Sequence, residues 1–286
     1  MSGILAYWVH DLSPFLIQFS DRFGIRYYGL AYVLGFLGGA WILREFARRG
    51  RSPLPAAAVG DLMVALVIGV FVGGRVGYFL FYQPETLLHR PLDFFKVWEG
   101  GMASHGGFLG VAVALIWFGR TRRLPFRHLG DLVAAAAPLG LLLGRIANFI
   151  NGELWGKITT FRWAVIFPDS APPGTPISEI PPRHASQLYE AALEGALMLA
   201  YCQWRAWRTP VLREQPGRLA GEFLLGYAVV RMFGELFREP DEGISLIFGL
   251  SRGSFYSVFL IAAGLVLILR PSRALAAAPD RAQRRG

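Results

Sequence analysis

Cysteine is almost absent from this sequence, and its scarcity narrows the possible chemistry. Cys202 is the single cysteine in 286 residues, so no internal disulfide can form. No histidine or other base lies near it in the sequence, and we therefore expect a packing residue rather than a nucleophile. The five histidines, at positions 10, 89, 105, 128 and 184, show no metal-ligand spacing. We accordingly expect no bound metal.

Motifs of common cofactor and hydrolase sites are also missing. The chain contains no phosphate-binding P-loop, no dinucleotide-binding glycine pattern and no G-x-S-x-G nucleophile motif. The net charge of +9 is not accompanied by the basic helix or the aromatic and basic motif that nucleic-acid binding requires. We therefore expect neither a cofactor nor a nucleic-acid partner.

Charged residues are scarce as well, and the sequence contains long apolar stretches instead. Only 17% of the residues are charged and 53% are hydrophobic, with a mean hydropathy of +0.39, which is too apolar for an ordinary soluble domain. A helix of roughly 20 apolar residues is long enough to cross a bilayer. We predict an all-α polytopic membrane protein with about seven transmembrane helices, at residues 27–46, 59–82, 104–119, 129–150, 187–207, 218–237 and 253–270.

Basic residues follow alternate apolar stretches. Arginine clusters lie at 44–51, 120–127, 205–218 and 270–285, after the first, third, fifth and seventh stretches. Cytoplasmic loops of membrane proteins carry an excess of Lys and Arg. The pattern therefore predicts an outward-facing N-terminus and a cytoplasmic C-terminus.

Three segments depart from the helical pattern. Residues 151–186 contain six prolines and are too polar to span a membrane, so we expect an irregular outward-facing arm or lid. Residues 271–286 are basic and rich in small residues, and we expect a disordered cytoplasmic tail after a single transmembrane domain at 1–270. The first 20 residues lack the basic start and cleavage site of a signal peptide, and their aromatic residues suit a segment at the membrane interface.

An internal repeat relates two of the apolar stretches. Residues 60–79 and 130–149 align without gaps, with Gly-Asp-Leu at the start and Gly-Arg near the end of each. Asp61 and Asp131 stand where N-caps of helices entering from the cytoplasmic side are expected. A parallel repeat of helix pairs would explain the match.

The repeat also places an arginine in the outer half of each of these helices. Charged residues at this depth are costly, and they usually line a polar cavity. For Arg75 two interpretations remain open, a structural arginine reaching the outer surface and a functional one. For Arg145 we favour function, because Asn148, Asn151 and Glu153 follow it and build a polar site.

Further polar side chains fall at the same outward level. They are His184, Gln187, Glu190 and Glu194 at the start of the fifth stretch, and Arg231, Glu235 and Arg238 along the sixth. Arg231 and Glu235 are four residues apart, so we expect an ion pair between them. Arg238 lies where the sixth stretch meets the outer surface, and we expect it to be free to face a ligand.

His105 opens the third stretch within "GGMASHGGFLG", where the glycines permit close approach of a ligand or of backbone. A hydrogen-bonded structural histidine and a functional one are both compatible with this setting. The planar guanidinium group of arginine matches phosphate, so arginines and amides at outer-leaflet depth favour a phospholipid headgroup as the ligand.

Several motifs are similar to those of a known family. "GRIANFINGELWG" fits the signature of the prolipoprotein diacylglyceryl transferases, and "IRYYGLAY", "GGMASHGGFLG", "RHASQLYEA" and "ELFREPDE" follow the family's pattern. The resemblance covers residues 25 to 260 approximately. It implies transfer of the diacylglyceryl group of phosphatidylglycerol to the lipobox cysteine thiol of bacterial prolipoproteins, in the inner membrane and without a cofactor.

The resemblance implies functional roles for Tyr28, His105, Arg145, Asn148, Glu153, Gly156, Arg238 and Glu242. We assign catalysis to His105, Arg145 and Arg238. Phosphatidylglycerol binding is assigned to Tyr28, Arg145, Asn148, Asn151, Glu153, Gly156, Glu190 and Glu242. His105 is a candidate base for the substrate thiol, and an orienting role is the alternative.

One segment departs from the family pattern, and two other functions remain as alternatives. "GLSRGSFYS" at 249–257 stands where the family more often has a Met-Gly-Gln run, which affects local packing. Repeats and intramembrane charge are also found in transporters and flippases. A phospholipid acyltransferase is the second alternative.

Overall fold

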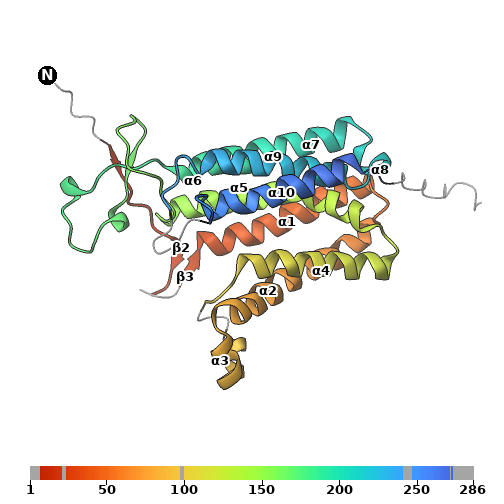
Figure 1. Ribbon diagram of the computed structural model, residues 1–286, viewed down its shortest axis with the longest axis horizontal. Helices are drawn as coiled ribbons and strands as arrows, with labels where there is room; N and C mark the ends of the chain where they lie inside the picture. Colours follow the sequence, from red (N-terminus) through yellow and green to blue (C-terminus); the bar gives the residue numbers. More distant parts are fainter. Residues whose placement is uncertain (1–6, 21–23, 97–99, 241–246, 271, 273–286) are drawn as a thin grey trace, which may run out of the picture.

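Helices account for most of the structure, a computed structural model that describes residues 7–20, 24–96, 100–240, 247–270 and 272 (Figure 1). The long helices are α1 (Tyr27–Arg48), α2 (Val59–Tyr82), α4 (Ser104–Arg122), α5 (Phe126–Ile150), α9 (Arg218–Gly234) and α10 (Arg252–Leu269). The fifth apolar stretch is a composite of α6 (Ser186–Glu190), the π-helical turn η6 (Ala191–Leu197) and α7 (Met198–Arg208).

Each of the seven predicted apolar stretches is therefore largely helical. Among the described residues, four helices are long and apolar enough to cross a membrane, at Tyr27–Arg48, Ala56–Tyr82, Phe126–Ile150 and Arg252–Leu269. Helix α9 has only 17 residues, and the π-helical turn divides the fifth stretch. The structure is consistent with an all-α membrane protein, while the number of seven spans stays a prediction.

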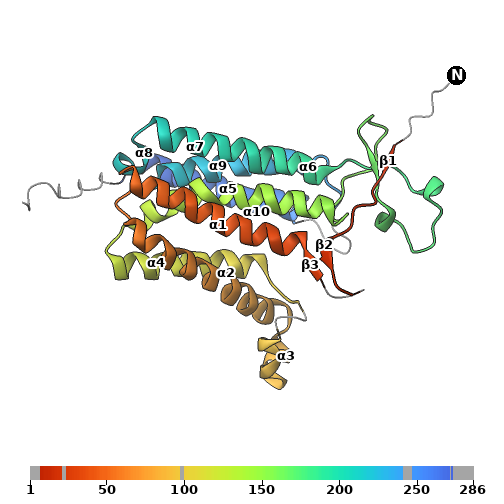
Figure 2. The same cartoon turned by 180° about the vertical axis from the view of Figure 1, so that it is seen from behind.

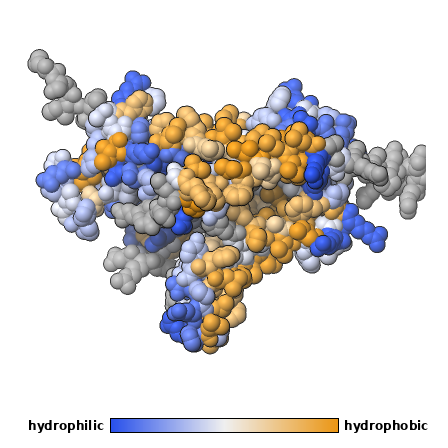
Figure 3. Space-filling view, viewed as in Figure 1, coloured by the Kyte–Doolittle hydropathy of each residue, from blue (hydrophilic) through white to orange (hydrophobic). Residues whose placement is uncertain are grey.

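Apolar side chains cover the middle of the helical body, and hydrophilic side chains gather toward its ends (Figure 3). A buried core lies beneath one end of this band and includes Phe46, Phe118, Leu132 and Cys202. Cys202 is fully buried as a free thiol, which confirms its expected packing role.

Helix α5 lies at the centre and packs on α1, α9 and the composite fifth stretch. Helices α2 and α4 form an antiparallel hairpin, and α1 lies between this hairpin and α9 (Figures 1 and 2). The hairpin is tight because glycines face one another across it. A Cβ atom added to Gly69 of α2 would lie 2.6 Å from the carbonyl oxygen of Gly110 on α4.

Described residues of the predicted basic clusters lie at one end of the helices, near the short helix α8 (Val211–Glu214). Arg51 donates hydrogen bonds to the carbonyl oxygens of Trp207 and Thr209. Arg127 donates to the carbonyl of Arg270. The shared location fits the charge pattern from which the orientation is predicted.

The other end carries the strands and the irregular arm (Figure 2). Strand β1 (Trp8–Val9) pairs in parallel with β4 (Val165–Ile166) of the arm. Strand β2 (Phe15–Gln18) pairs in antiparallel fashion with β3 (Gly24–Arg26), which leads directly into α1. The remaining short elements are η1 (Ala56–Ala58), α3 (Pro84–His89), η2 (Pro91–Phe95), η4 (Pro168–Ser170) and η5 (Ile177–Glu179).

The predicted N-caps are wrong, because both helices begin before the aspartates. Helix α2 begins at Val59, and Asp61 in its first turn pairs with Arg122. Helix α5 begins after Pro125, so Asp131 lies inside it. Its buried carboxyl group accepts hydrogen bonds from the backbone N–H groups of Gly217, at 2.7 Å, and Ala220, at 2.8 Å. Asp131 thus caps the N-terminus of α9 instead of its own helix.

Candidate functional site

The C-terminal end of α5 brings three of the predicted site residues together. The helix ends at Ile150, and Gly152 adopts a left-handed conformation with φ +68° that turns the chain back. Asn148 donates a hydrogen bond of 2.7 Å to Oε1 of Glu153, and Asn151 donates one of 3.3 Å to the same oxygen. Both amides therefore hold the carboxylate of Glu153 in place.

Arg145 lies one turn before Asn148 on the same face of α5 and forms ion pairs with two carboxylates. Its Nη1 lies 2.9 Å from Oε2 of Glu190, and its Nη2 lies 3.1 Å from Oε2 of Glu194. The side chains of Glu190 and Glu194 are 1% and 0% exposed, and that of Arg145 is 16% exposed. The side chain of Arg145 is thus mostly buried but keeps some exposed surface.

The local structure of the fifth stretch explains why both glutamates face Arg145. Glu190 ends α6, and Glu194 lies in the π-helical turn that follows. A π-helical turn widens the helix and is common at functional sites. Helix α5 approaches this turn closely, since a Cβ atom on Gly195 would lie 2.5 Å from Cα of Leu142.

Helix α9 and the residues after it supply two more arginines. Nη1 of Arg231 lies 2.8 Å from Glu190 and 3.3 Å from Glu194, and its Nη2 lies 2.5 Å from Glu235. The predicted pair of Arg231 with Glu235 is confirmed, but it is part of a larger network. The expectation of a free Arg238 is wrong, because its Nη1 lies 3.5 Å from Oε1 of Glu190.

We call these six residues the Arg–Glu cluster: Arg145, Arg231, Arg238, Glu190, Glu194 and Glu235. Its formal charges balance, as burial of ions requires. Glu190 lies at its centre, within ion-pairing distance of all three arginines. The sequence placed all six residues at the same outward level, but it did not predict the ion pairs that join Glu190 and Glu194 to Arg145, Arg231 and Arg238, because these pairs connect segments that are distant in sequence.

Gly156 allows the arm to approach the segment that carries Arg238. Its backbone N–H donates to the carbonyl of His184, and the next residue, Lys157, donates to that of Phe237. A Cβ atom on Gly156 would lie 2.5 Å from the carbonyl oxygen of Phe237. Burial lowers the pKa of the neighbouring His184, whose Nδ1 lies 3.2 Å from the hydroxyl group of Tyr189. The structure thus gives Gly156 a spacing role.

Gln187 joins the turn after α5 to the fifth stretch. Its Nε2 donates a hydrogen bond of 2.6 Å to the backbone carbonyl of Glu153, and its side chain is fully buried. Gln187 is three residues before Glu190 on the same helical face. The turn that holds Glu153 is therefore tied to the central carboxylate of the Arg–Glu cluster.

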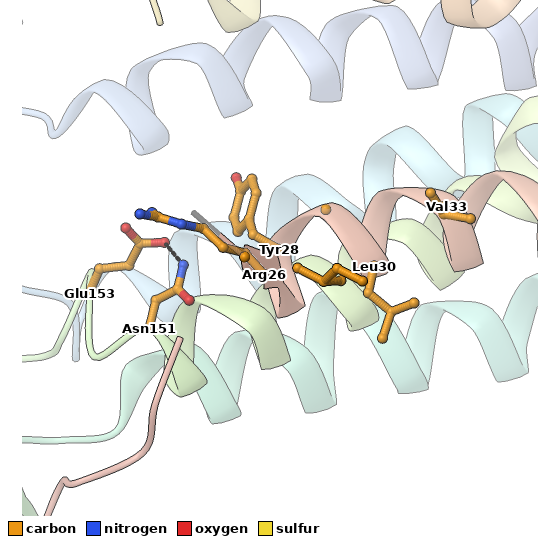
Figure 4. A pocket seen from close by; sticks show the side chains of 9 residues that line it. Arg26, Tyr28, Leu30, Val33, Asn151 and Glu153 are labelled. Carbon is orange, nitrogen blue, oxygen red and sulfur yellow. Dashed lines mark hydrogen bonds between the residues drawn. The ribbon is translucent and has the colours of Figure 1, made fainter. Parts of the chain in front are cut away.

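A cavity of about 700 Å³ lies on the other side of this turn, between α1 and the end of α5 (Figure 4). Tyr28, Asn151 and Glu153, three predicted binding residues, line it together with Arg26. The remaining lining residues are small or apolar: Gly24, Ile25, Gly29, Leu30 and Val33. Sequence reasoning missed Arg26, although it lies within the "IRYYGLAY" motif.

Arg75 has a structural role. It donates hydrogen bonds to the carbonyl oxygens of Asp93, Phe94, Lys96, Gly100 and Gly101. These bonds hold the described part of the connection between α2 and α4, which favours the structural interpretation of Arg75.

Two predicted site residues are not brought into this site by the described structure. Glu242 lies outside the described residues. His105 is the second residue of α4, on the hairpin with α2, and its side chain is also outside the described part.

The fold and the cluster together define a helical membrane protein with a buried, arginine-rich polar site at one end. A family model described as prolipoprotein diacylglyceryl transferase matches residues 14–270. A Rhodospirillum rubrum protein named phosphatidylglycerol–prolipoprotein diacylglyceryl transferase is 44% identical over 266 residues, which is 92% of this chain and 93% of that protein. Proteins of the same name from Rhodospirillum centenum and a Shewanella species are 46% and 40% identical, over 86% and 91% of this chain and 87% and 96% of their own length. The chain therefore belongs to the prolipoprotein diacylglyceryl transferase family and is a transferase.

Proposed function

We propose that this protein transfers the diacylglyceryl group of phosphatidylglycerol to the lipobox cysteine thiol of bacterial prolipoproteins, the first step of lipoprotein maturation. The proposal places the protein in the bacterial inner membrane, with seven spans, the arm facing outward and the basic end in the cytoplasm. Membership of the family supports the reaction. The observation that carries the site assignment is the contact of both Arg145 and Arg238 with Glu190, which gathers two arginines at one point.

The reaction breaks the bond between the diacylglyceryl carbon and the phosphate oxygen, and it forms a carbon–sulfur bond. The substrate thiol loses its proton, and glycerol phosphate departs with an additional negative charge. Arg145 and Arg238 would stabilise this charge more strongly in the transition state than in the bound lipid, which is the condition for catalysis.

The glutamates of the cluster would orient the arginines before the lipid arrives. A buried arginine without a counter-ion is strongly destabilising, by about 3–5 kcal/mol. Glu190 and Glu194 supply that charge to Arg145 and are themselves almost fully buried. The side chain of Arg145 keeps 16% of its surface exposed, and a phosphate oxygen would approach it there. Glu190 would then contribute to substrate binding by positioning the arginines.

Glu153, Asn148 and Asn151 would form the adjoining wall of the lipid site. The hydrogen bonds from both amides hold one carboxylate oxygen of Glu153. Tyr28 faces the same space from α1. These groups suit the hydroxyl-bearing headgroup of phosphatidylglycerol, because hydroxyl groups donate to carboxylates and accept from phenols.

His105 is proposed as the base that accepts the thiol proton. A thiol with pKa near 8.5 is only about 3% ionised at pH 7, so a positioned base matters. If His105→Gln removes that base, the rate of the variant should rise about tenfold per pH unit up to the thiol pKa and approach the wild-type rate. Parallel pH profiles between pH 6.5 and 9.5 would instead give His105 an orienting role.

The site assignment is tested by headgroup release. Purified protein in vesicles receives phosphatidylglycerol labelled in its headgroup glycerol, with and without a lipobox peptide, and soluble glycerol phosphate is measured. Arg238→Lys should reduce release, whereas Arg162→Lys, on an arm arginine outside the site, should not. Equal release by both variants would remove Arg238 from the site.

A further inference from the structure

The cavity beside α1 carries two opposite charges. Among its lining residues the charged ones are Arg26 and Glu153 (Figure 4). Their side chains point toward one another in the close-up, and the ion pairs found among the described residues do not include this pair. A headgroup that enters the cavity would therefore meet both charges. The formal charge of the lining is zero only because Arg26 offsets Glu153.

Arg26 is held at the rim by the β2–β3 hairpin. It is the last residue of β3, directly before α1, and its guanidinium carbon lies 4.7 Å from the ring centroid of Phe15 on β2. A cation over an aromatic ring is attracted to its face. The described residues place no carboxylate within ion-pairing distance of Arg26, in contrast to the three arginines of the Arg–Glu cluster.

Asn151, which also lines the cavity, carries a hydrogen-bond acceptor that has no donor among the described residues. Oδ1 of Asn151 is buried and receives no hydrogen bond from the described residues. Buried polar atoms are rarely left without a partner. The amide nitrogen of Asn151 is already used, since it donates to Glu153. A headgroup hydroxyl that enters the cavity would donate to the carboxylate of Glu153, which both amides hold in place.

We propose that Arg26 is a specificity-determining residue that makes this cavity select an uncharged polyol headgroup, the glycerol of phosphatidylglycerol, over a headgroup that ends in an ammonium group. This inference rests on the proposed function and deepens it. With Arg26 present, an ammonium group meets a neutral lining and a neighbouring cation. Without Arg26, the same group meets the carboxylate of Glu153 alone and is attracted. Glycerol, which has no charge, gains little from the change.

The size of the effect follows from the exposure of Arg26. Arg26 is exposed, so water screens its charge and the effect is modest. Two unit charges a few ångströms apart at such a site change a binding constant roughly three- to tenfold. We therefore expect discrimination between headgroups to weaken by that factor when the charge of Arg26 is removed.

The test compares the two headgroups directly in one assay. Vesicles of phosphatidylcholine carry phosphatidylglycerol as the substrate and phosphatidylethanolamine as the competitor, with a lipobox peptide as the acceptor. The ratio of the inhibition constant of phosphatidylethanolamine to the KM of phosphatidylglycerol is measured. Arg26→Gln should lower this ratio three- to tenfold, while Arg26→Lys, which keeps the charge, should retain it.

Arg162→Gln is the matched control, because the Arg162 guanidinium also lies over an aromatic ring, 4.8 Å from that of Trp163, but lies on the arm. Its ratio should equal that of the wild type. If Arg26→Gln is unstable, Arg26→Met keeps the aliphatic contact with Phe15 and serves instead. If Arg26→Gln and Arg26→Met leave the ratio of inhibition constant to KM unchanged, the proposal is wrong. The same conclusion holds if these variants change only the KM of the peptide. Absence of transfer by the wild-type protein would refute the proposed function instead.

Discussion

Replacement of Asp131 by alanine should destabilise the protein much more than the same change at Asp61, its counterpart in the sequence repeat. Asp131 is fully buried, and it accepts hydrogen bonds from Gly217 and Ala220 at the first turn of α9. Alanine provides neither acceptor. Asp61, by contrast, is 58% exposed and pairs with the half-exposed Arg122.

The expected magnitude follows from the two backbone donors that lose their partner. A buried donor without an acceptor costs about 1–3 kcal/mol, so two such donors cost about 2–6 kcal/mol. One kcal/mol shifts the thermal midpoint of a chain of this size by roughly 2–4 °C, which gives a loss of at least 4 °C for Asp131→Ala. An exposed ion pair contributes about 0–1 kcal/mol, and Asp61→Ala should therefore shift the midpoint by less than 4 °C.

The assay is thermal unfolding of the purified variants in one detergent. Membrane proteins often unfold irreversibly, so all midpoints are measured at the same scan rate. Helix α9 also carries Arg231, and loss of its N-cap should reduce transferase activity at temperatures where the wild type is folded. Similar midpoints for the two alanine variants would refute the assignment of Asp131 as the cap of α9.

Three further changes have defined outcomes. Arg145→Lys keeps the charge but cannot reach both Glu190 and Glu194, and each charge-assisted contact is worth about 1.5–3 kcal/mol, so the thermal midpoint should decrease and kcat/KM should fall about 10- to 100-fold; a wild-type kcat/KM would contradict the role of Arg145. Gly73→Ala should lower the thermal midpoint by overpacking, because its Cβ atom would lie 2.8 Å from a backbone atom of α4; a midpoint equal to the wild type would contradict the tight hairpin. Burial lowers the pKa of His184, so the folded state binds its proton less readily than the unfolded state, and stability should decrease as the pH falls below about 6.5. The unfolding midpoint of the wild type should therefore decrease more between pH 8 and pH 5 than that of His184→Gln, and equal decreases would contradict this reasoning.

The sequence predicted the helices well because their signal is local. Apolar stretches of spanning length and clusters of arginine at their ends are read directly from neighbouring residues. The short motif from Gly144 to Gly156 likewise predicted that Asn148, Asn151 and Glu153 would lie together, since all three lie within about one turn of the C-terminal end of α5.

The sequence could not predict contacts that join distant helices. Asp131 resembled a cap of its own helix. Only the packing of α5 on α9 reveals which backbone N–H groups donate hydrogen bonds to its carboxyl group. Arg238 resembled a free surface arginine because Glu190 is 48 residues away in the chain. Arg26 was missed because the cavity exists only where α1 approaches the end of α5.

The chemical identity of the product tests the account most directly. Purified protein is incubated with phosphatidylglycerol and a lipobox peptide, and the peptide is analysed by mass spectrometry beside a control peptide with serine in place of its cysteine. We predict that the cysteine peptide gains one diacylglyceryl group in a thioether, which resists alkaline hydrolysis, with release of one equivalent of glycerol phosphate. A peptide that gains only an acyl chain in an ester or amide, or lipid movement without any change in the peptide, would contradict the proposed reaction.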